Sequence, residues 1–196
     1  MPPGITGNGY SSRTWKGEKM LTDRFQRRFT YLRLSLTERC NFRCNYCLPD
    51  GNDCSSQEPD LNQHEIRRLL TAFAMLGTRK IRLTGGEPAL RKDLPDIIAL
   101  SKHIPGIETV ALTTNGFNIQ RELPNWIHAG LDALNVSVDS LEASAFSRIT
   151  GADRLHYILD GIDQALASPL RRVKLNTVLL RQHNAGTLPA FLRYIK

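Results

Sequence analysis

The sequence contains no apolar run close to the roughly 20 residues that a membrane-spanning helix requires. Its first 20 residues have no continuous apolar segment, which excludes a secretory signal, and Glu18 with several glycines and prolines disfavours a transit peptide. There is also no basic stripe interleaved with aromatic residues and no nucleic-acid-binding motif. These absences predict a protein whose partners include neither a membrane nor a nucleic acid.

Cysteine is absent outside one short stretch of the chain. All four cysteines lie between positions 40 and 54, whereas a disulfide framework normally links distant segments, so we expect reduced thiols and a cytoplasmic protein. Acidic residues are absent from residues 171–196, which hold six Lys and Arg residues, and the whole chain carries a net charge of +7. This uneven charge is typical either of a solvated basic surface or of a site for an anionic ligand.

The length of 196 residues suffices for one domain with a complete hydrophobic core, and the apolar (41%) and charged (23%) fractions are ordinary for a globular protein. We expect residues 1–20 to form a disordered tail, with Met20 as an alternative start, and residues 21–196 to form the domain. The sequence ends inside a predicted helix with no closing strand, so we also expect this domain to be truncated.

Alternating apolar and polar residues predict five strands, each followed by helical sequence. The expected strands are residues 31–36, 80–83, 109–113, 133–138 and 174–180. The expected helices are residues 61–76, 94–103, 121–129, 142–149 and 154–167, and a last one that begins near Thr187. The first helix has the clearest ends, because Asn62 and Glu65 form a capping-box pattern and Gly77 follows the last turn.

Consecutive strand–helix units imply an α/β fold with a parallel sheet and right-handed crossovers. The order of elements fits either a Rossmann-type open sheet or a partial barrel. In several strands one set of alternate positions is apolar and the other is polar or cationic, and successive residues of a strand face opposite sides. Two explanations of the polar face stay open: edge strands that face water, and a barrel interior that binds an anionic ligand.

The most informative motif is C-x3-C-x2-C, which Cys40, Cys44 and Cys47 form directly after the first predicted strand. Three thiolates can hold a 4Fe–4S cluster and leave one iron open for a small molecule. Zinc is the alternative, but a structural zinc site takes four ligands and no histidine lies nearby. We interpret Cys54 as a bystander in the following loop, since a reactive cysteine requires a lowered pKa.

Polar, glycine-containing segments follow the next three strands as well. They are Thr84-Gly85-Gly86-Glu87-Pro88, Thr113-Thr114-Asn115-Gly116 and Ser137-Val138-Asp139-Ser140. Each alone is compatible with a turn or a helix cap, but α/β proteins bind ligands at the carboxyl ends of their strands. Four successive strands that end in such segments predict one shared ligand site.

In these segments the sequence resembles the radical S-adenosylmethionine superfamily and, more narrowly, its GTP 3′,8-cyclase family of molybdenum cofactor biosynthesis. The resemblance runs from about residue 21 to the end of the sequence, in matching order and spacing. It is carried by RRFTYLRLSLTERCNFRCNYCLPDG, KIRLTGGEPALRKDL, ALTTNG, NVSVDSL and VKLNTVLLR. It implies an incomplete (β/α)6 TIM-like barrel of parallel strands with outer helices, truncated after about five units, with a cluster at its mouth.

The resemblance also implies roles for individual residues. The positions of the cluster ligands are matched by Cys40, Cys44 and Cys47. The positions that contact S-adenosylmethionine are matched by Tyr46, Gly86 and Ser137. The positions around GTP are matched by Arg33, Lys80, Arg82, Thr113 and Lys174, all on the polar set of strand positions, which favours a barrel interior. No catalytic side chain beyond the cluster ligands is implied.

The reaction that the resemblance implies begins with cleavage of S-adenosylmethionine to methionine and a 5′-deoxyadenosyl radical. This radical removes hydrogen from C3′ of GTP, and C3′ then bonds to C8 of guanine. The implied partners are GTP and an electron donor for the cluster, with a homodimer as an open alternative to a monomer.

The sequence also departs from the family, because members carry three further cysteines for a second 4Fe–4S cluster that is not encoded here. The activity of this chain alone is therefore open. Two other functions remain as alternatives. One is a catalytically inactive iron–sulfur fragment. The other is a different radical enzyme, such as a peptide modifier, which fits the cysteines but leaves the cationic set Arg33, Lys80, Arg82 and Lys174 unexplained.

Overall fold

The computed structural model of the chain describes residues 20–47 and 59–195. Its strands are β1 (Tyr31–Ser35), β2 (Lys80–Thr84), β3 (Thr109–Thr114), β4 (Ala133–Ser137) and β5 (Arg172–Asn176). Its helices are α1 (Gln63–Met75), α2 (Leu94–Lys102), α3 (Ile119–His128), α4 (Ala143–Thr150), α5 (Leu155–Leu166) and α6 (Leu188–Tyr194), with short 3-10 turns η1 (Pro88–Leu90) and η2 (Ala185–Thr187). The expected alternation of strands and helices is confirmed over this part of the chain.

Helix α1 shows how local sequence sets the ends of an element. The Asn62 side chain accepts a hydrogen bond from Glu65 N at 3.0 Å, and the Glu65 carboxylate accepts one from Asn62 N at 2.9 Å. This reciprocal pair satisfies two backbone donors that the first turn leaves free. At the other end Gly77 adopts φ +90°, a left-handed conformation that glycine reaches at low cost. Both predicted ends of the helix are confirmed within two residues.

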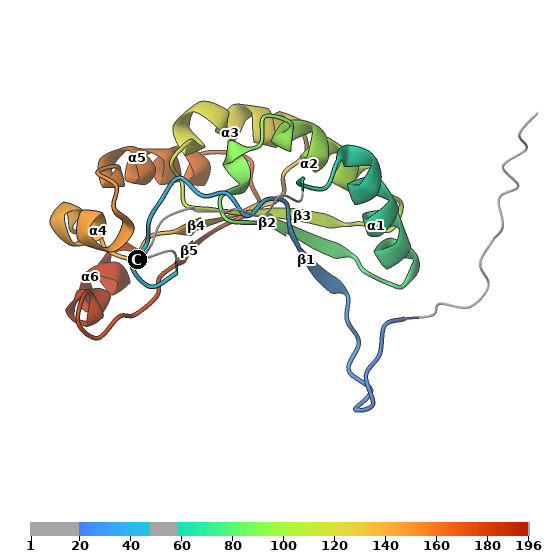
Figure 1. Cartoon of the computed structure of the whole chain (residues 1–196), viewed down its shortest axis with the longest axis horizontal. Coiled ribbons are helices and arrows are strands. Elements are labelled where there is room, and N and C mark those ends of the chain that lie inside the picture. Colours follow the sequence, from blue (N-terminus) through green and yellow to red (C-terminus); the bar gives the residue numbers. More distant parts are fainter. Residues whose placement is uncertain (1–19, 48–58, 196) are drawn as a thin grey trace, which may run out of the picture.

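The five strands form one parallel sheet in the order β1-β2-β3-β4-β5. A Rossmann-type sheet reverses its strand order at a switch point and carries helices on both faces. Here the order is consecutive, and Figure 1 shows α1, α2, α3 and α5 together above the sheet. Consecutive parallel strands with outer helices are the arrangement of a (β/α) barrel. The chain therefore folds as a partial TIM-like barrel, and the Rossmann alternative is wrong.

The strand register separates an apolar face from a polar one. The row under the helices consists of Leu34, Leu83, Leu112, Leu134 and Val173, and all four leucines are buried. The neighbouring row, which points to the opposite side, consists of Arg33, Arg82, Ala111, Ala133 and Arg172. The helices thus cover a continuous apolar surface, and the charged side chains lie on the face turned away from them.

This second face, which we call the cationic face, is defined by Arg33, Lys80, Arg82, Arg172 and Lys174. Water-exposed edge strands do not explain it, because β2 lies between β1 and β3 and still contributes Lys80 and Arg82. Thr113, on β3, shares the face, since it pairs in register with Asn135 and Asn135 with Lys174. A polar barrel interior therefore accounts for the pattern better than edge strands that face water.

Strand β5 differs from its prediction. It covers Arg172–Asn176 instead of residues 174–180, so the predicted strand began and ended too late. The ladder ends because side chains take over its hydrogen bonds: the Thr177 hydroxyl donates to Val138 O at 2.7 Å, and Val178 N donates to Asp139 Oδ1 at 2.9 Å. Such distant partners are invisible in the sequence, so the apolar residues after Asn176 look like a continued strand.

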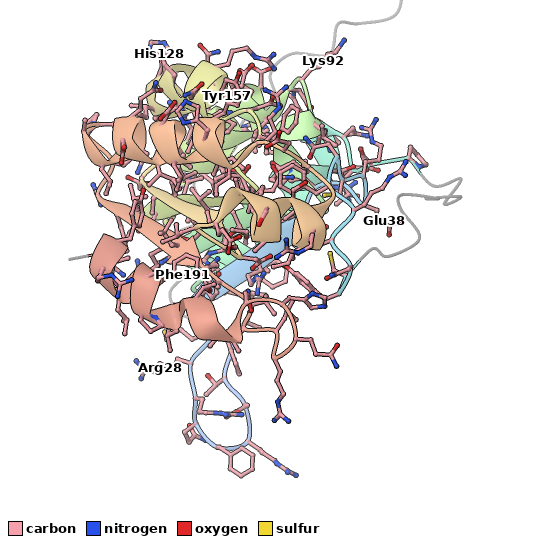
Figure 2. All side chains as sticks on the ribbon, turned by 90° about the vertical axis from the view of Figure 1, so that its left-hand side faces the viewer. Arg28, Glu38, Lys92, His128, Tyr157 and Phe191 are labelled. Carbon is pink, nitrogen blue, oxygen red and sulfur yellow. The ribbon has the colours of Figure 1, made fainter. Side chains whose placement is uncertain are left out.

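Before β1, residues 20–30 form a narrow excursion that projects from the body of the sheet and carries Arg28 (Figures 1 and 2). A bridge between Thr22 and Arg28 closes it, and Asp23 accepts hydrogen bonds from Phe25 N and Arg27 N. The expected tail, residues 1–20, lies outside the described residues except for Met20. In the part of the chain that the structure describes, no helix is long and apolar enough to cross a membrane.

Candidate functional site

The segment that leads to the cysteine motif lies against the glycine-rich loop after β2. Gly86 N donates to Thr37 O at 2.7 Å, and Glu87 N donates to Arg39 O at 2.7 Å. A Cβ on Gly86 would overlap the carbonyl group of Arg39, so this approach requires glycine. Sequence reasoning attributed the glycine to a ligand, whereas its first role is to let the chain pass immediately before Cys40.

The cysteine-bearing loop is fixed from two further sides. The last turn of α4 accepts hydrogen bonds from the backbone N–H groups of Arg43, at 2.9 Å, and Asn45, at 3.0 Å. Phe42 is buried and makes edge-to-face contacts with Phe117, at 6.1 Å between ring centroids, and Phe146, at 6.0 Å. Figure 2 looks at this side of the molecule and labels Glu38, which lies two residues before Cys40 in the sequence. The motif is therefore held on an anchored loop at the mouth of the barrel.

The three thiols have different environments. Cys44 is buried, Cys40 is half-buried and Cys47 is exposed. Burial, together with the nearby Cys47, Asp139 and Cys40, raises the pKa of Cys44 to about 12. Burial also raises the pKa of Cys40. Deprotonated thiols at these positions would repel one another without a bound cation, which is the condition that a metal centre satisfies.

The donor set fits a cluster better than a single ion. Within the described residues, no group of three or more His, Cys, Asp or Glu side chains is arranged to hold one metal ion. In a 4Fe–4S cluster each cysteine binds a different iron, so its three sulfurs need not converge on one point. Three neighbouring thiols on one fixed loop fit such a cluster with one iron left free. Cys54 lies outside the described residues.

Glu87 connects the loop after β2 to the loop after β3. Its carboxylate is buried and accepts three hydrogen bonds: from Ala89 N at 2.9 Å, from the Thr114 hydroxyl at 2.7 Å and from Asn115 N at 2.6 Å. Burial raises the pKa of Glu87 to about 7, against the opposing effect of these three donors. One side chain thus fixes two of the segments that border the cysteine loop.

Asn115 extends this network to the cysteine motif itself. Its side-chain amide donates to Asn41 Oδ1 at 2.8 Å and lies 3.9 Å from Cys40 Sγ, within the longer range of hydrogen bonds to sulfur. The backbone of Asn115 is held by Glu87, as described above. The amide is therefore a fixed donor beside one of the three predicted cluster ligands.

Asp139 performs a similar role at the end of β4. Its Oδ2 accepts the hydroxyl hydrogen of Tyr46 at 2.7 Å, and its carbonyl oxygen accepts a hydrogen bond from Asn184 Nδ2 at 2.6 Å. Burial and the hydrogen bond to Asp139 raise the pKa of Tyr46, so its hydroxyl stays protonated and donates. Both Asp139 and Asn184 are buried. The residue before Cys47 is thereby tied to the segment after β5.

The cationic face carries polar atoms that lack partners. Arg82 Nε and Thr113 Oγ1 are buried, and neither has a hydrogen-bond partner among the described residues. A buried polar atom without a partner costs free energy, and an anionic or polar ligand would remove that cost. Burial and the charges of Arg82, Arg172 and Lys174 lower the pKa of Lys80, so the cations from β2 and β5 act on one another across the sheet.

The structure brings the predicted site residues to one side of the sheet but at different depths. Tyr46, Gly86 and Ser137 all lie at the carboxyl ends of the strands, where the cysteine loop also lies. Arg33, Arg82, Thr113 and Lys174 lie further along the cationic face. Lys80, the first residue of β2, lies farthest from the mouth. The predicted residues thus lie either at the carboxyl end of the sheet or on its cationic face, and they form no single cluster of direct contacts.

Sequence reasoning missed the structural roles of Glu87, Asn115 and Asp139. Each belongs to a loop segment that the sequence singled out as part of a shared ligand site, but no individual role was predicted for any of the three residues. The available signal was an acidic or amide residue directly after a buried strand end. Whether such a side chain turns inward to bind a neighbouring loop depends on contacts between segments more than 20 residues apart.

Comparison with known proteins gives matches to a family model and to curated proteins. The family model described as the radical SAM superfamily matches residues 34–195. The chain is 55% identical over 178 residues to GTP 3′,8-cyclase of Pectobacterium atrosepticum. The aligned region covers 90% of this chain and 54% of that protein. The chain is also 56% identical over 176 residues to GTP 3′,8-cyclase of Stenotrophomonas maltophilia, with the same two shares. The chain spans about half the length of the curated relatives it matches.

Solved structures with a similar fold are much more distant in sequence. Streptococcus suis SuiB bound to the precursor peptide SuiA matches with a TM-score of 0.66 and 14% identity, over 84% of this chain and 36% of that one. The enzyme anSMEcpe with bound AdoMet matches with a TM-score of 0.68 and 12% identity, over 84% of this chain and 48% of that one. At these identities the likeness concerns the fold alone.

Proposed function

The chain belongs to the radical S-adenosylmethionine superfamily, and from this premise we propose that Cys40, Cys44 and Cys47 hold a 4Fe–4S cluster whose fourth iron binds S-adenosylmethionine. Membership implies a cluster and this cofactor in general terms. The choice of ligands is supported by the spacing of the three thiols and by the anchoring of their loop. When bound, such a cluster supplies the electron that cleaves S-adenosylmethionine and so starts radical chemistry on a substrate.

We propose Tyr46, Gly86 and Ser137 as contacts of S-adenosylmethionine. Gly86 uses its N–H group to bind Thr37, and its carbonyl oxygen accepts no hydrogen bond from the described residues, so this oxygen is available to an amino group. Tyr46 uses its hydroxyl to bind Asp139, which leaves its backbone and ring as the parts that can contact a cofactor. These residues position the cofactor at the mouth of the barrel, beside the cysteine loop.

For the substrate we propose GTP, and for the reaction its 3′,8-cyclisation in molybdenum cofactor biosynthesis. One observation carries this proposal: Arg33, Lys80, Arg82, Thr113 and Lys174 lie on the face that leads to the cysteine loop, and two of them hold buried atoms without partners. Such a face suits a triphosphate, because cationic donors bind phosphate oxygens with charge-assisted hydrogen bonds. The names of the two curated relatives point to the same substrate.

The proposed working unit is the domain from residue 21 onward, with an external electron donor for the cluster and the cytoplasm as its compartment. The chain's own residues bind the phosphates on the cationic face and orient the cofactor at the mouth, and the apolar row on the opposite face packs the sheet against the helices. The proposal does not choose between a monomer and a homodimer; measurement of the molecular mass in solution decides between them.

The experiment that tests the substrate proposal is a binding titration under anaerobic conditions. We expect the chain to bind GTP, to bind neutral guanosine far more weakly, and to lose GTP affinity between low salt and 0.2 M salt, because salt screens the contacts between phosphates and cations. Arg82→Ala should weaken GTP binding by about tenfold or more, since a hydrogen bond to a charged group contributes ~1.5–3 kcal/mol. Equal affinity for guanosine and GTP would contradict a phosphate site on this face.

The reaction is tested separately. The reconstituted chain is incubated with GTP, S-adenosylmethionine and a chemical reductant, and the products are identified by mass spectrometry. The proposed activity predicts 5′-deoxyadenosine and a cyclised GTP product that depend on Cys44. If GTP binds but neither product forms, the binding proposal stands and the assignment of cyclase activity to this chain falls.

A further inference from the structure

Arg172 stands at the first position of β5, outside every motif that the sequence singles out. In register it lies opposite Ala133, which lies opposite Ala111, which lies opposite Arg82. Residues paired in neighbouring parallel strands project to the same side of the sheet. Arg172 and Arg82 therefore project to the same side, on the cationic face, with two alanines between them, and Arg33 continues the row beyond Arg82.

The two alanines in this row are unusually well buried for their place in the sheet. Ala111 is 0% exposed and Ala133 is 7% exposed, although they lie on the face that the helices leave uncovered. On the β2 side the guanidinium of Arg82 lies over the ring of Tyr31, 5.5 Å from its centroid, and on the β5 side Arg172 is exposed. Burial and the charge of Arg82 lower the pKa of Lys80, and the charge of Arg172, three strands away, contributes to the same effect. The two buried alanines are thus flanked by Arg82 on one side and Arg172 on the other.

Arg172 also lacks a partner that would explain its position structurally. Among the described residues it forms no ion pair, and no strand position of the cationic face is acidic. Its neighbour Arg171 differs in this respect, because Arg171 Nε lies 3.6 Å from Asp132 Oδ1. The two adjacent arginines therefore have different roles. Arg171 pairs with an acid at the amino end of the sheet, and Arg172 is available to a ligand.

We propose that Arg172 binds the phosphate chain of a nucleoside triphosphate from the β5 side and makes the site selective for a polyphosphate over a monophosphate. This inference rests on the proposed function, which places the triphosphate on the cationic face. The backbones of β2 and β5 are about 14 Å apart across three strand spacings, and both arginines have long, rotatable side chains. A single phosphate can contact one of the two arginines, whereas an extended phosphate chain can contact both.

The test compares Arg172→Gln with the matched control Arg171→Gln. Both variants remove one positive charge from adjacent positions, so they change the net charge of the chain equally. Binding of GTP and of GMP to the full chain is measured by titration calorimetry at low salt. We expect Arg172→Gln to weaken GTP binding about tenfold, to change GMP binding less than twofold, and so to reduce the preference for GTP. Arg171→Gln should change either affinity less than twofold.

Three outcomes would overturn the inference, and they can be told apart from failure of the proposed function. Equal effects of Arg172→Gln and Arg171→Gln would show that only net charge matters. Equal loss of GTP and GMP affinity in Arg172→Gln would show that Arg172 does not distinguish a triphosphate from a monophosphate. If Arg82→Gln weakens GTP binding while Arg172→Gln does not, the phosphate site stands and this inference alone falls. If the parent chain does not bind GTP at all, both fall.

Discussion

Replacement of Glu87 tests whether one buried carboxylate holds the loops of the site together. Three donors depend on it: Ala89 N, the Thr114 hydroxyl and Asn115 N. A buried donor left without an acceptor costs ~1–3 kcal/mol, so Glu87→Ala should lower the free energy of unfolding by at least about 3 kcal/mol. That is a large share of the total stability of a typical domain.

The ionisation of Glu87 gives this prediction a second, independent signature. Its pKa is about 7 in the folded chain, above the ordinary value of 4.5 that applies when the chain is unfolded. The folded state therefore holds the proton more tightly, and the stability linked to it is fully present below pH 4.5 and lost as the pH rises to 7. The difference between the two pKa values corresponds to about 3 kcal/mol.

Urea unfolding of the metal-free, reduced chain at pH 5 and pH 8 measures both effects. Glu87→Gln keeps the shape of the side chain but cannot ionise, so its stability relative to the parent should rise by about 2.5 kcal/mol between pH 5 and pH 8. Glu122→Gln is the matched control, because Glu122 pairs at the surface with Arg121 and should change stability by less than about 1 kcal/mol. A pH-independent difference between Glu87→Gln and the parent, or a loss below 1 kcal/mol in Glu87→Ala, would refute the reasoning.

Two further predictions concern the cysteine loop. Gly86→Ala should prevent cluster assembly and destabilise the chain, because the added Cβ overlaps the carbonyl group of Arg39; iron content and thermal unfolding measure this, and a normal cluster yield would contradict it. Asn115→Ala should shift the midpoint potential of the cluster to more negative values, by roughly 60 mV if the hydrogen bond to Cys40 favours the reduced state tenfold, while Asn118→Ala, whose amide donates to Ala89 O instead, should not.

Much of the fold follows from local sequence. The capping box of α1 is fixed by residues three positions apart, so Asn62 and Glu65 reveal it without any tertiary information. The alternation along β1 and β2 likewise identifies which side chains share a face. The alternation could not show whether the polar face belongs to edge strands that face water, because the position of β2 inside the sheet depends on its pairing with both neighbouring strands.

The candidate site was predictable in its motifs but not in its connections. The spacing of Cys40, Cys44 and Cys47 identifies the cluster loop as a hypothesis, since it depends on neighbouring residues only. The hydrogen bond from Tyr46 to Asp139 joins residues 93 positions apart, and no local pattern encodes it. The early end of β5 has the same cause, because Asp139 also accepts the hydrogen bond of Val178 N.

The central claim, an iron–sulfur cluster with one open iron on this loop, is tested most directly by electron paramagnetic resonance of the anaerobically reconstituted and reduced chain, with and without S-adenosylmethionine. The account predicts about four iron and four sulfide per chain and a spectrum that changes when the cofactor is added. Cys54→Ser should give the same spectra, and Cys44→Ser should give no intact cluster. Stoichiometric zinc without sulfide, or a spectrum unchanged at saturating S-adenosylmethionine, would contradict the claim.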